Sequence, residues 1–224
     1  MHSHRAVPEL PQLTTGVHLL EAEGRPVGPL HALVLDHLLL DGGRAVWVDA
    51  NGYASSTHLA ELAPSPRVLD RIDVARGFTA YQHQALLQDA TDAIEDATSL
   101  LVAPAVDRFY RDDDIRGAEP QALLMKSLSQ LASYAREAGL PVLVTRTAAD
   151  DFAAPVERLA DAVLTVQQTA FGPRFQGPDF ETLCYTDGGA TMQTTLTYWA
   201  QVLEARAPLH EEAATEEPTA RVSP

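Results

Sequence analysis

Residues 99–106 read SLLVAPAV, an apolar stretch without a charged side chain. A strand that is covered on both faces of a parallel sheet has this continuous apolar character. Long amphipathic helices are predicted on either side of it, at residues 81–97 and at residues 121–138, where Gly139 is the expected C-cap. The stretch therefore predicts the centre of an α/β fold with a mostly parallel sheet and helices on both faces.

The same alternation of strands and helices extends in both directions along the chain. Further strands are predicted at residues 17–22, 45–50, 72–78 and 142–145, and further helices at residues 30–40 and 55–63. Such alternation implies right-handed βαβ units. Open α/β sheets bind their ligands at the carboxyl ends of the strands, so the residues that follow each strand are the candidates for function.

The C-terminal third departs from this alternation. Residues 161–169 and 182–188 predict late strands, for which an antiparallel pair is one arrangement, joined by a loop at residues 171–179. Residues 190–202 are interpreted as a continuation of the sheet. The tail after them is acidic, lacks an apolar period and is predicted to be disordered. The expected organisation is an N-terminal segment at residues 1–15, a core domain at residues 16–205 and an acidic tail at residues 206–224.

The charge of the chain limits its partners. There are 31 acidic and 16 basic residues, the net charge is −15, and Lys126 is the single lysine. A surface of hydrated carboxylates is expected in a high-salt cytoplasm, and a GC-rich genome is the other explanation of this bias. The charge disfavours nucleic acid at low salt, whereas molar salt screens the repulsion to within about 3 Å.

Several other classes of protein are disfavoured. No apolar run approaches the roughly 20 residues of a membrane span, and the first residues lack the apolar run of a secretory signal, so a cytoplasmic protein is expected. Cys184 has no cysteine to pair with and is expected to be a buried small residue. No spacing of His or Cys fits a metal site, and His31, His37 and His58 are expected on helix surfaces. The triple aspartate at residues 112–114 is interpreted as a solvated loop.

Four segments, taken in order, resemble the ATPase core of the RecA/RadA recombinase family over about residues 16–200. The sequence VARGFTAYQHQ at residues 74–84 resembles the family segment A-R-A-F-x-x-x-H-Q. The sequence VWVDANGY at residues 46–53 resembles its second strand. FYRDDDIRG at residues 109–117 resembles its first DNA-binding loop, and VLVT at residues 142–145 resembles the strand after that loop. The resemblance implies a RecA-like P-loop NTPase fold with late antiparallel strands.

The loop after the first strand departs from the family pattern. A phosphate-binding loop needs glycines whose N–H groups wrap the phosphates, a lysine, and a hydroxyl for Mg²⁺. Here Glu23 replaces the first glycine, Pro29 replaces the lysine and lacks an N–H, and Leu30 replaces the hydroxyl. The vestigial nucleotide loop consists of Glu23, Gly24, Arg25, Pro26, Val27, Gly28, Pro29 and Leu30.

The other catalytic positions implied by the resemblance are also changed. Asn51 stands at the position of the water-activating glutamate, and an amide cannot accept a proton at neutral pH. Pro104 stands at the position of the metal-organising aspartate, and Arg146 and Thr147 stand where the family has Asn-Gln. Phosphoryl transfer depends on charge neutralisation by lysine and Mg²⁺. The interpretation is a pseudo-ATPase with no catalytic residue and no expected cofactor.

Three hypotheses for the function follow from the resemblance. In the first, the chain is a non-catalytic accessory or regulatory subunit in DNA recombination or repair, which binds a RecA/RadA-type subunit, a second copy of itself or DNA without hydrolysing ATP. In the second, the chain is a divergent nucleotide-binding ATPase in which Arg25 or Arg146 substitutes for the lysine, so that it binds ATP and Mg²⁺ and hydrolyses ATP slowly. In the third, the chain is a regulatory adaptor of RecA-like fold unrelated to DNA.

DNA contact is a further expectation carried by the resemblance alone. Arg111 and Arg116 match the arginines of the family's first DNA-binding loop, where guanidinium groups grip phosphate. The neighbouring triple aspartate weakens that expectation. The interval that would contain the second DNA-binding loop, residues 145–161, is short and acidic, which argues against strand exchange.

Overall fold

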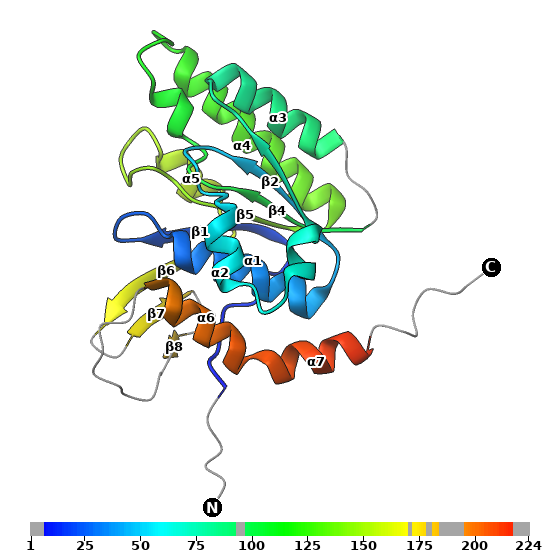
Figure 1. The fold of residues 1–224 in the computed structure, drawn as a ribbon. Coiled ribbons are helices and arrows are strands. Elements are labelled where there is room, and N and C mark those ends of the chain that lie inside the picture. Colours follow the sequence, from blue (N-terminus) through cyan, green and yellow to red (C-terminus); the bar gives the residue numbers. More distant parts are fainter. Residues whose placement is uncertain (1–6, 93–96, 170–171, 178–180, 184–194, 217–224) are drawn as a thin grey trace, which may run out of the picture.

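The chain forms a single eight-stranded sheet among the residues that the structure describes (Figure 1). The structure, a computed structural model, describes residues 7–92, 97–169, 172–177, 181–183 and 195–216. The strands are β1 (Gly16–Ala22), β2 (Arg44–Asp49), β3 (Ile72–Arg76), β4 (Thr98–Ala103), β5 (Pro141–Val144), β6 (Ala162–Thr169), β7 (Gly172–Gln176) and β8 (Glu181–Leu183). Their order across the sheet is β3-β2-β4-β5-β1-β6-β7-β8.

The first six strands are parallel, and β7 and β8 are antiparallel to their neighbours. The predicted α/β class, with a mostly parallel sheet and late antiparallel strands, is therefore confirmed. β4 corresponds to the apolar stretch that decided the prediction, and its residues 100–103 are fully buried because helices cover both faces.

Helices cover the two faces of the sheet in two groups (Figure 1). One face is covered by α3 (Ala80–Asp92), α4 (Glu119–Ala138) and α5 (Ala154–Leu159). The other is covered by α1 (Val27–Asp41), α2 (Ser56–Leu62) and α6 (Thr195–Ala205), and α7 (Ala207–Glu216) packs on α1. Two short 3₁₀ helices, η1 (Pro66–Arg71) and η2 (Arg108–Arg111), lie in the connections.

Three predictions for the C-terminal third are wrong. The predicted loop at residues 171–179 contains strand β7, whose Phe175 is fully buried and packs against Trp199. Residues 195–202, predicted as part of the sheet, belong to α6 because Tyr198, Trp199, Val202 and Leu203 line one helical face. Cys184 lies outside the described residues.

The third error is the tail, which is helical over residues 207–216 where disorder was predicted. Arg206 joins α6 to α7 and donates to both carboxylate oxygens of Asp36 in α1, at 2.6 and 2.8 Å. It also donates to the carbonyl of Pro8 at 2.7 Å, and His210 Nε2 donates to Asp36 Oδ1 at 2.7 Å. These buried contacts hold the N-terminal segment and α7 against α1. Residues 217–224 lie outside the described residues.

Because α6 and α7 cover it, α1 has almost no solvent-facing side. Residues 28–38 are all buried, and they include two of the histidines that were predicted on helix surfaces. His31 is fully buried and donates from Nε2 to the carbonyl of Tyr53 at 2.8 Å, and His37 does the same to the carbonyl of Ser99 at 3.0 Å. The surface prediction is therefore wrong for both; His58 in α2 is half-buried.

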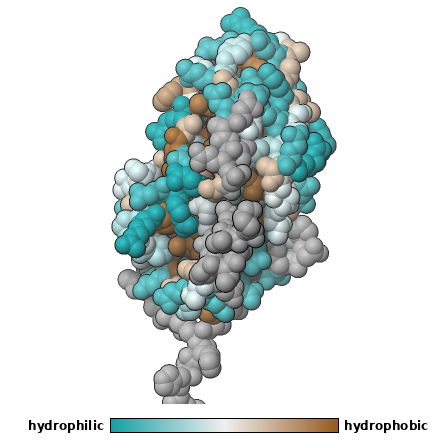
Figure 2. Space-filling view, turned by 90° about the vertical axis from the view of Figure 1, so that its right-hand side faces the viewer, coloured by the Kyte–Doolittle hydropathy of each residue, from teal (hydrophilic) through white to brown (hydrophobic). Residues whose placement is uncertain are grey.

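One face of the molecule is mostly polar among its described residues. Figure 2 shows one face on which hydrophilic residues dominate and hydrophobic residues occur in small, separated groups. None of the described helices is long and apolar enough to cross a membrane.

Candidate functional site at the carboxyl ends of the strands

A cavity of about 720 Å³ lies where the first strand leads into α1. Its walls come from the end of β1, the loop at residues 23–26, the loop after β2, the loop after β5, and β6. Half of the predicted site residues line it: Glu23, Gly24, Arg25, Pro26, Asn51, Arg146 and Thr147. A cavity therefore lies at the carboxyl edge of the sheet, where the functional residues were predicted.

The start of α1 offers few free N–H donors to this cavity. The N–H of Val27 bonds to the carbonyl of Arg25, the N–H of Leu30 bonds to the carbonyl of Pro26, and Pro29 has none. Pro29 and Leu30, which were predicted to replace a lysine and a hydroxyl, are buried within α1. A phosphate group therefore meets neither a cationic side chain nor a cradle of N–H groups at this helix.

Gly28, a residue of the predicted nucleotide loop, serves packing. A Cβ atom at this position would lie 2.5 Å from the indole ring of Trp199 in α6. Trp199 is fully buried, and its ring also packs edge-on against Tyr198 and Phe175. The glycine allows α6 to approach the first turn of α1 closely.

Arg25 is held at the rim of the cavity. Its guanidinium lies 4.4 Å from the centre of the Tyr53 ring and donates to the carbonyl of Asn51 at 2.8 Å. Asn51 adopts a left-handed backbone with φ of 68°, a conformation that asparagine tolerates better than most residues. Asn51 and Tyr53 belong to the loop after β2. Asp49 fixes this loop: its carboxylate is fully buried and accepts from the N–H groups of Tyr53 and Ala54.

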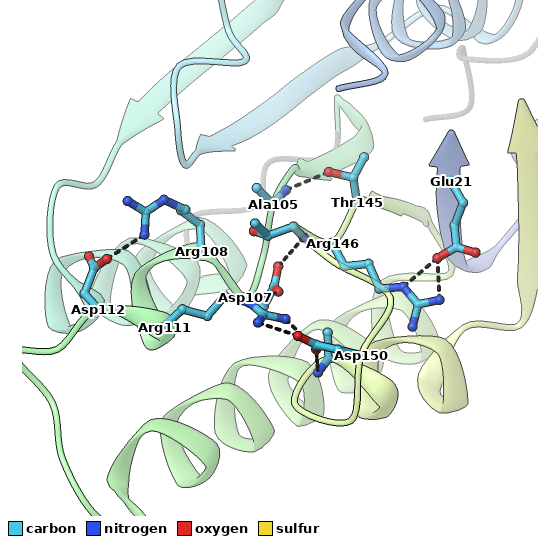
Figure 3. Close-up of polar contacts among 11 residues, drawn as sticks. Glu21, Ala105, Asp107, Arg108, Arg111, Asp112, Thr145, Arg146 and Asp150 are labelled. Carbon is cyan, nitrogen blue, oxygen red and sulfur yellow. Dashed lines mark hydrogen bonds and ion pairs between the residues drawn. The ribbon is translucent and has the colours of Figure 1, made fainter. Parts of the chain in front are cut away.

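Arg146 lies at the opposite wall, where it contacts Glu21 (Figure 3). Its Nε donates to Glu21 Oε1 at 2.5 Å, and its NH2 group donates to Glu157 Oε2 at 2.9 Å. The side chain is 6% exposed. The sequence left open whether this arginine faces a nucleotide or forms an ion pair, and the structure places it in two ion pairs while it lines the cavity.

Pro104 follows β4 but does not line the cavity. The backbone after it turns sharply at Ala105, whose φ is 47°. The N–H of Ala105 donates to Thr145 Oγ1 at 2.7 Å, and the N–H of Val106 donates to the carbonyl of Thr145 at 3.0 Å (Figure 3). These bonds join the loops that follow β4 and β5 without involving the proline.

The two arginines of the candidate DNA-binding loop differ in their surroundings. Arg111 forms ion pairs with Asp107 and Asp150, whereas Arg116 is exposed. Within the triple aspartate, Asp112 pairs with Arg108 at 2.5 Å, and Asp113 and Asp114 are exposed. The structure thus separates the two candidates: one guanidinium is occupied by carboxylates of the same chain, and the other faces solvent beside aspartates.

Sequence reasoning missed the carboxylates that organise this region. Asp107 is fully buried; its Oδ2 accepts from Arg111 Nε at 2.6 Å and its Oδ1 accepts from the N–H of Thr147 at 2.7 Å. The spacing of Asp107 and Arg111, four residues apart, was a usable signal for this pair. The pairing of Arg111 with Asp150, 39 residues away, has no local signal.

A buried polar chain links α3, η2 and α4 behind these loops. His83 Nδ1 lies 3.0 Å from the hydroxyl of Tyr110, which lies 2.7 Å from Ser127 Oγ. Burial lowers the pKa of His83 to about 4 and raises the pKa of Tyr110 to about 12, so both are neutral at physiological pH. Within the described part of the chain, no group of three or more His, Cys, Asp or Glu side chains is placed to hold a metal ion.

Comparison with known proteins identifies the family. The Rad51 family model matches residues 37–164, which run from the middle of α1 into β6 and cover more than half of the chain. The vestigial loop at residues 23–30 precedes the matched region. A search of curated proteins gives no match. The match, together with the parallel sheet and its late antiparallel strands, shows that this chain belongs to the Rad51 family and has its RecA-like fold.

Proposed function

We propose that this chain is a non-catalytic member of the Rad51 family that acts in DNA recombination or repair as an accessory subunit. It would dock on a related recombinase subunit, or on a second copy of itself, without binding or hydrolysing ATP. The observation that carries this proposal is the state of the cavity: the two arginines that line it, Arg25 and Arg146, are already engaged by groups of the same chain.

Electrostatics supports the absence of nucleotide. Arg146 is paired with both Glu21 and Glu157, so a phosphate would have to displace a carboxylate to reach it. Glu23 adds another carboxylate to the cavity wall. Each unpaired carboxylate repels a triphosphate, and no lysine lines the cavity to offset this charge. A dead nucleotide site remains compatible with a role in assembly, because docking does not require turnover.

The edge of the sheet supports the docking role. β3 pairs with β2 along one side only, and no described strand pairs with its other side. An unpaired edge is a ready template for a strand from another protein. Val74 in the middle of β3 is 46% exposed, and a small apolar groove of about 130 Å³ lies beside it, lined by Ala54, Ser56, Leu59, Leu69, Ile72 and Val74.

Val74→Asp is expected to weaken docking about tenfold or more. A strand that docks on β3 would bury the new carboxylate in the apolar groove, whose described lining residues include no cationic side chain to pair with it. The measurement is capture of partners from native lysate by the tagged protein, with the recovered proteins identified and quantified by mass spectrometry. Recovery of a Rad51-family subunit by the parent, and its loss with Val74→Asp, is the expected result. Sedimentation of the purified protein tests self-association with the same variant.

Met125→Asp is the matched control for this experiment. Met125 lies in α4 and is 44% exposed, so the substitution adds the same charge at a similar exposure but away from the edge strand. Equal recovery of the recombinase subunit by Val74→Asp and parent protein would refute docking at this edge. Recovery of signalling proteins without any recombinase subunit would favour the adaptor hypothesis instead.

A further inference from the structure

The guanidinium of Arg111 is oriented so that its two terminal nitrogens form a fork. Asp107, buried beneath it, accepts from Nε at 2.6 Å and fixes the plane of the group. The ring of Phe152 lies against the guanidinium, 4.9 Å from centroid to Cζ. NH1 and NH2 point away from Asp107 toward Asp150 (Figure 3). A fork held in this way is preorganised for a planar or tetrahedral oxyanion.

The carboxylate of Asp150 occupies this fork. Its Oδ2 accepts from NH1 at 2.8 Å, and its Oδ1 accepts from NH2 at 2.7 Å and from the N–H of Ala153 at 3.0 Å. The Arg111 guanidinium holds the pKa of the Asp150 carboxyl well below its usual range, so the carboxylate is charged at neutral pH. Two parallel guanidinium bonds and one backbone N–H are also the contacts by which proteins bind a phosphate group.

We propose that Asp150 is an internal occupant of a phosphate-binding site on Arg111, and that this contact keeps a DNA phosphodiester out of the site until Asp150 moves away. The proposal rests on the proposed role in recombination and names how DNA contact at this loop is regulated. The contact lies between two loops: the loop after β4 contributes Arg111, and the loop after β5 contributes Asp150.

The site is accessible enough for an exchange of occupants. The side chain of Asp150 is 45% exposed and that of Arg111 is 22% exposed, so the fork lies at the surface. Asp107 stays bonded to Nε whichever anion occupies the fork, because it is held from the other side by the N–H of Thr147. The side chains of Asp113, Asp114 and Asp151 are exposed and repel a phosphodiester. The parent protein is therefore expected to bind DNA weakly.

The first experiment measures the anion site with inorganic phosphate. Asp150→Ala should gain thermal stability as phosphate is added, because phosphate refills the fork. Asp151→Ala removes the same charge from the adjacent residue and leaves the fork occupied, so it should show no such gain. Arg111→Ala/Asp150→Ala should lose the gain. Equal phosphate responses of Asp150→Ala and Asp151→Ala would overturn the proposal.

The second experiment measures fluorescence anisotropy of a labelled single-stranded oligonucleotide at low salt. Asp150→Ala should bind it about tenfold more tightly than Asp151→Ala, the factor expected for a recovered charge-assisted contact. The double variant should return to the Asp151→Ala affinity. A gain with phosphate but none with DNA would overturn the assignment to a phosphodiester. Neither experiment involves the cavity or β3, so their failure is distinct from failure of the proposed function.

Discussion

The free energy of unfolding should fall by several kcal/mol when the pH is lowered from 7.5 to about 4.5. Four buried histidines have pKa values lowered by burial: His18, His31, His37 and His83. For His31 and His83 the pKa falls to about 4, against 6.5 for an unperturbed histidine. Between pH 6.5 and pH 4 these histidines are protonated in the unfolded chain but stay neutral in the folded protein. Protonation therefore favours the unfolded chain, and the free energy of unfolding, which is highest above pH 6.5, falls toward pH 4.

The magnitude follows from the shift: each of His31 and His83 contributes roughly 3 kcal/mol at the acid end of this window. Urea unfolding at several pH values measures the effect. Neutralisation of surface carboxylates acts in the opposite direction, because it relieves the repulsion of a chain with a net charge of −15. That repulsion is screened in 1 M KCl and the histidine effect is not, so the acid loss should be larger in high salt. Equal stability at pH 5 and pH 7.5 in 1 M KCl would contradict this reasoning.

Asp36→Ala should lower the free energy of unfolding by roughly 3–5 kcal/mol, since it leaves a buried guanidinium without its partner. The Arg206 side chain is 5% exposed, and both of its bonds to Asp36 are lost in the variant, together with the bond from His210. Urea unfolding at pH 7.5 is the measurement. The N-terminal segment and α7 should also become sensitive to proteolysis, because Arg206 joins Pro8 and α7 to α1.

Asp41→Ala provides the control on the same helix. Asp41 Oδ2 lies 3.1 Å from His37 Nδ1, but the Asp41 side chain is 60% exposed, so the loss should stay within about 1 kcal/mol. A loss for Asp36→Ala no larger than that for Asp41→Ala would show that the contacts of Arg206 do not hold the termini to the core.

The parallel part of the fold could be predicted because its signal is local. Strand β4 is apolar from Leu100 to Ala103, and helices such as α4 are amphipathic, so periodicity and turn residues placed these elements within a few residues. The antiparallel end and the tail carry weaker signals. β7 is a short strand, GPRFQ, that begins with Gly-Pro, and α7 is a polar helix that contacts the core through few side chains.

A clue to the covered helix was nevertheless present in the sequence. α1 contains apolar residues on every side, with only His31, Asp36 and His37 as polar interruptions before Asp41. A helix that is hydrophobic all round is buried all round, which requires a further layer outside it. The sequence does not say which segment supplies that layer, because the partner of Asp36 is 170 residues away.

In the candidate site, too, some features could be predicted from local sequence and others could not. The replaced residues at positions 23–30, 51 and 146 could be read against the family pattern, and the structure gathers most of them around one cavity. Their partners could not be read: Glu21 and Glu157 around Arg146, and Asp150 at Arg111, are ordinary acidic residues in an acidic sequence. Their roles depend on which strand ends the sheet order brings together.

Calorimetric titration of the purified protein with ATP and Mg²⁺, at both low and molar KCl, tests the central claim most directly. The occupied arginines and the buried Pro29 lead to the expectation of no saturable binding at either salt concentration. A dissociation constant in the micromolar range, lost on Arg25→Ala or Arg146→Ala, would contradict the account and establish a nucleotide site that uses a substitute arginine.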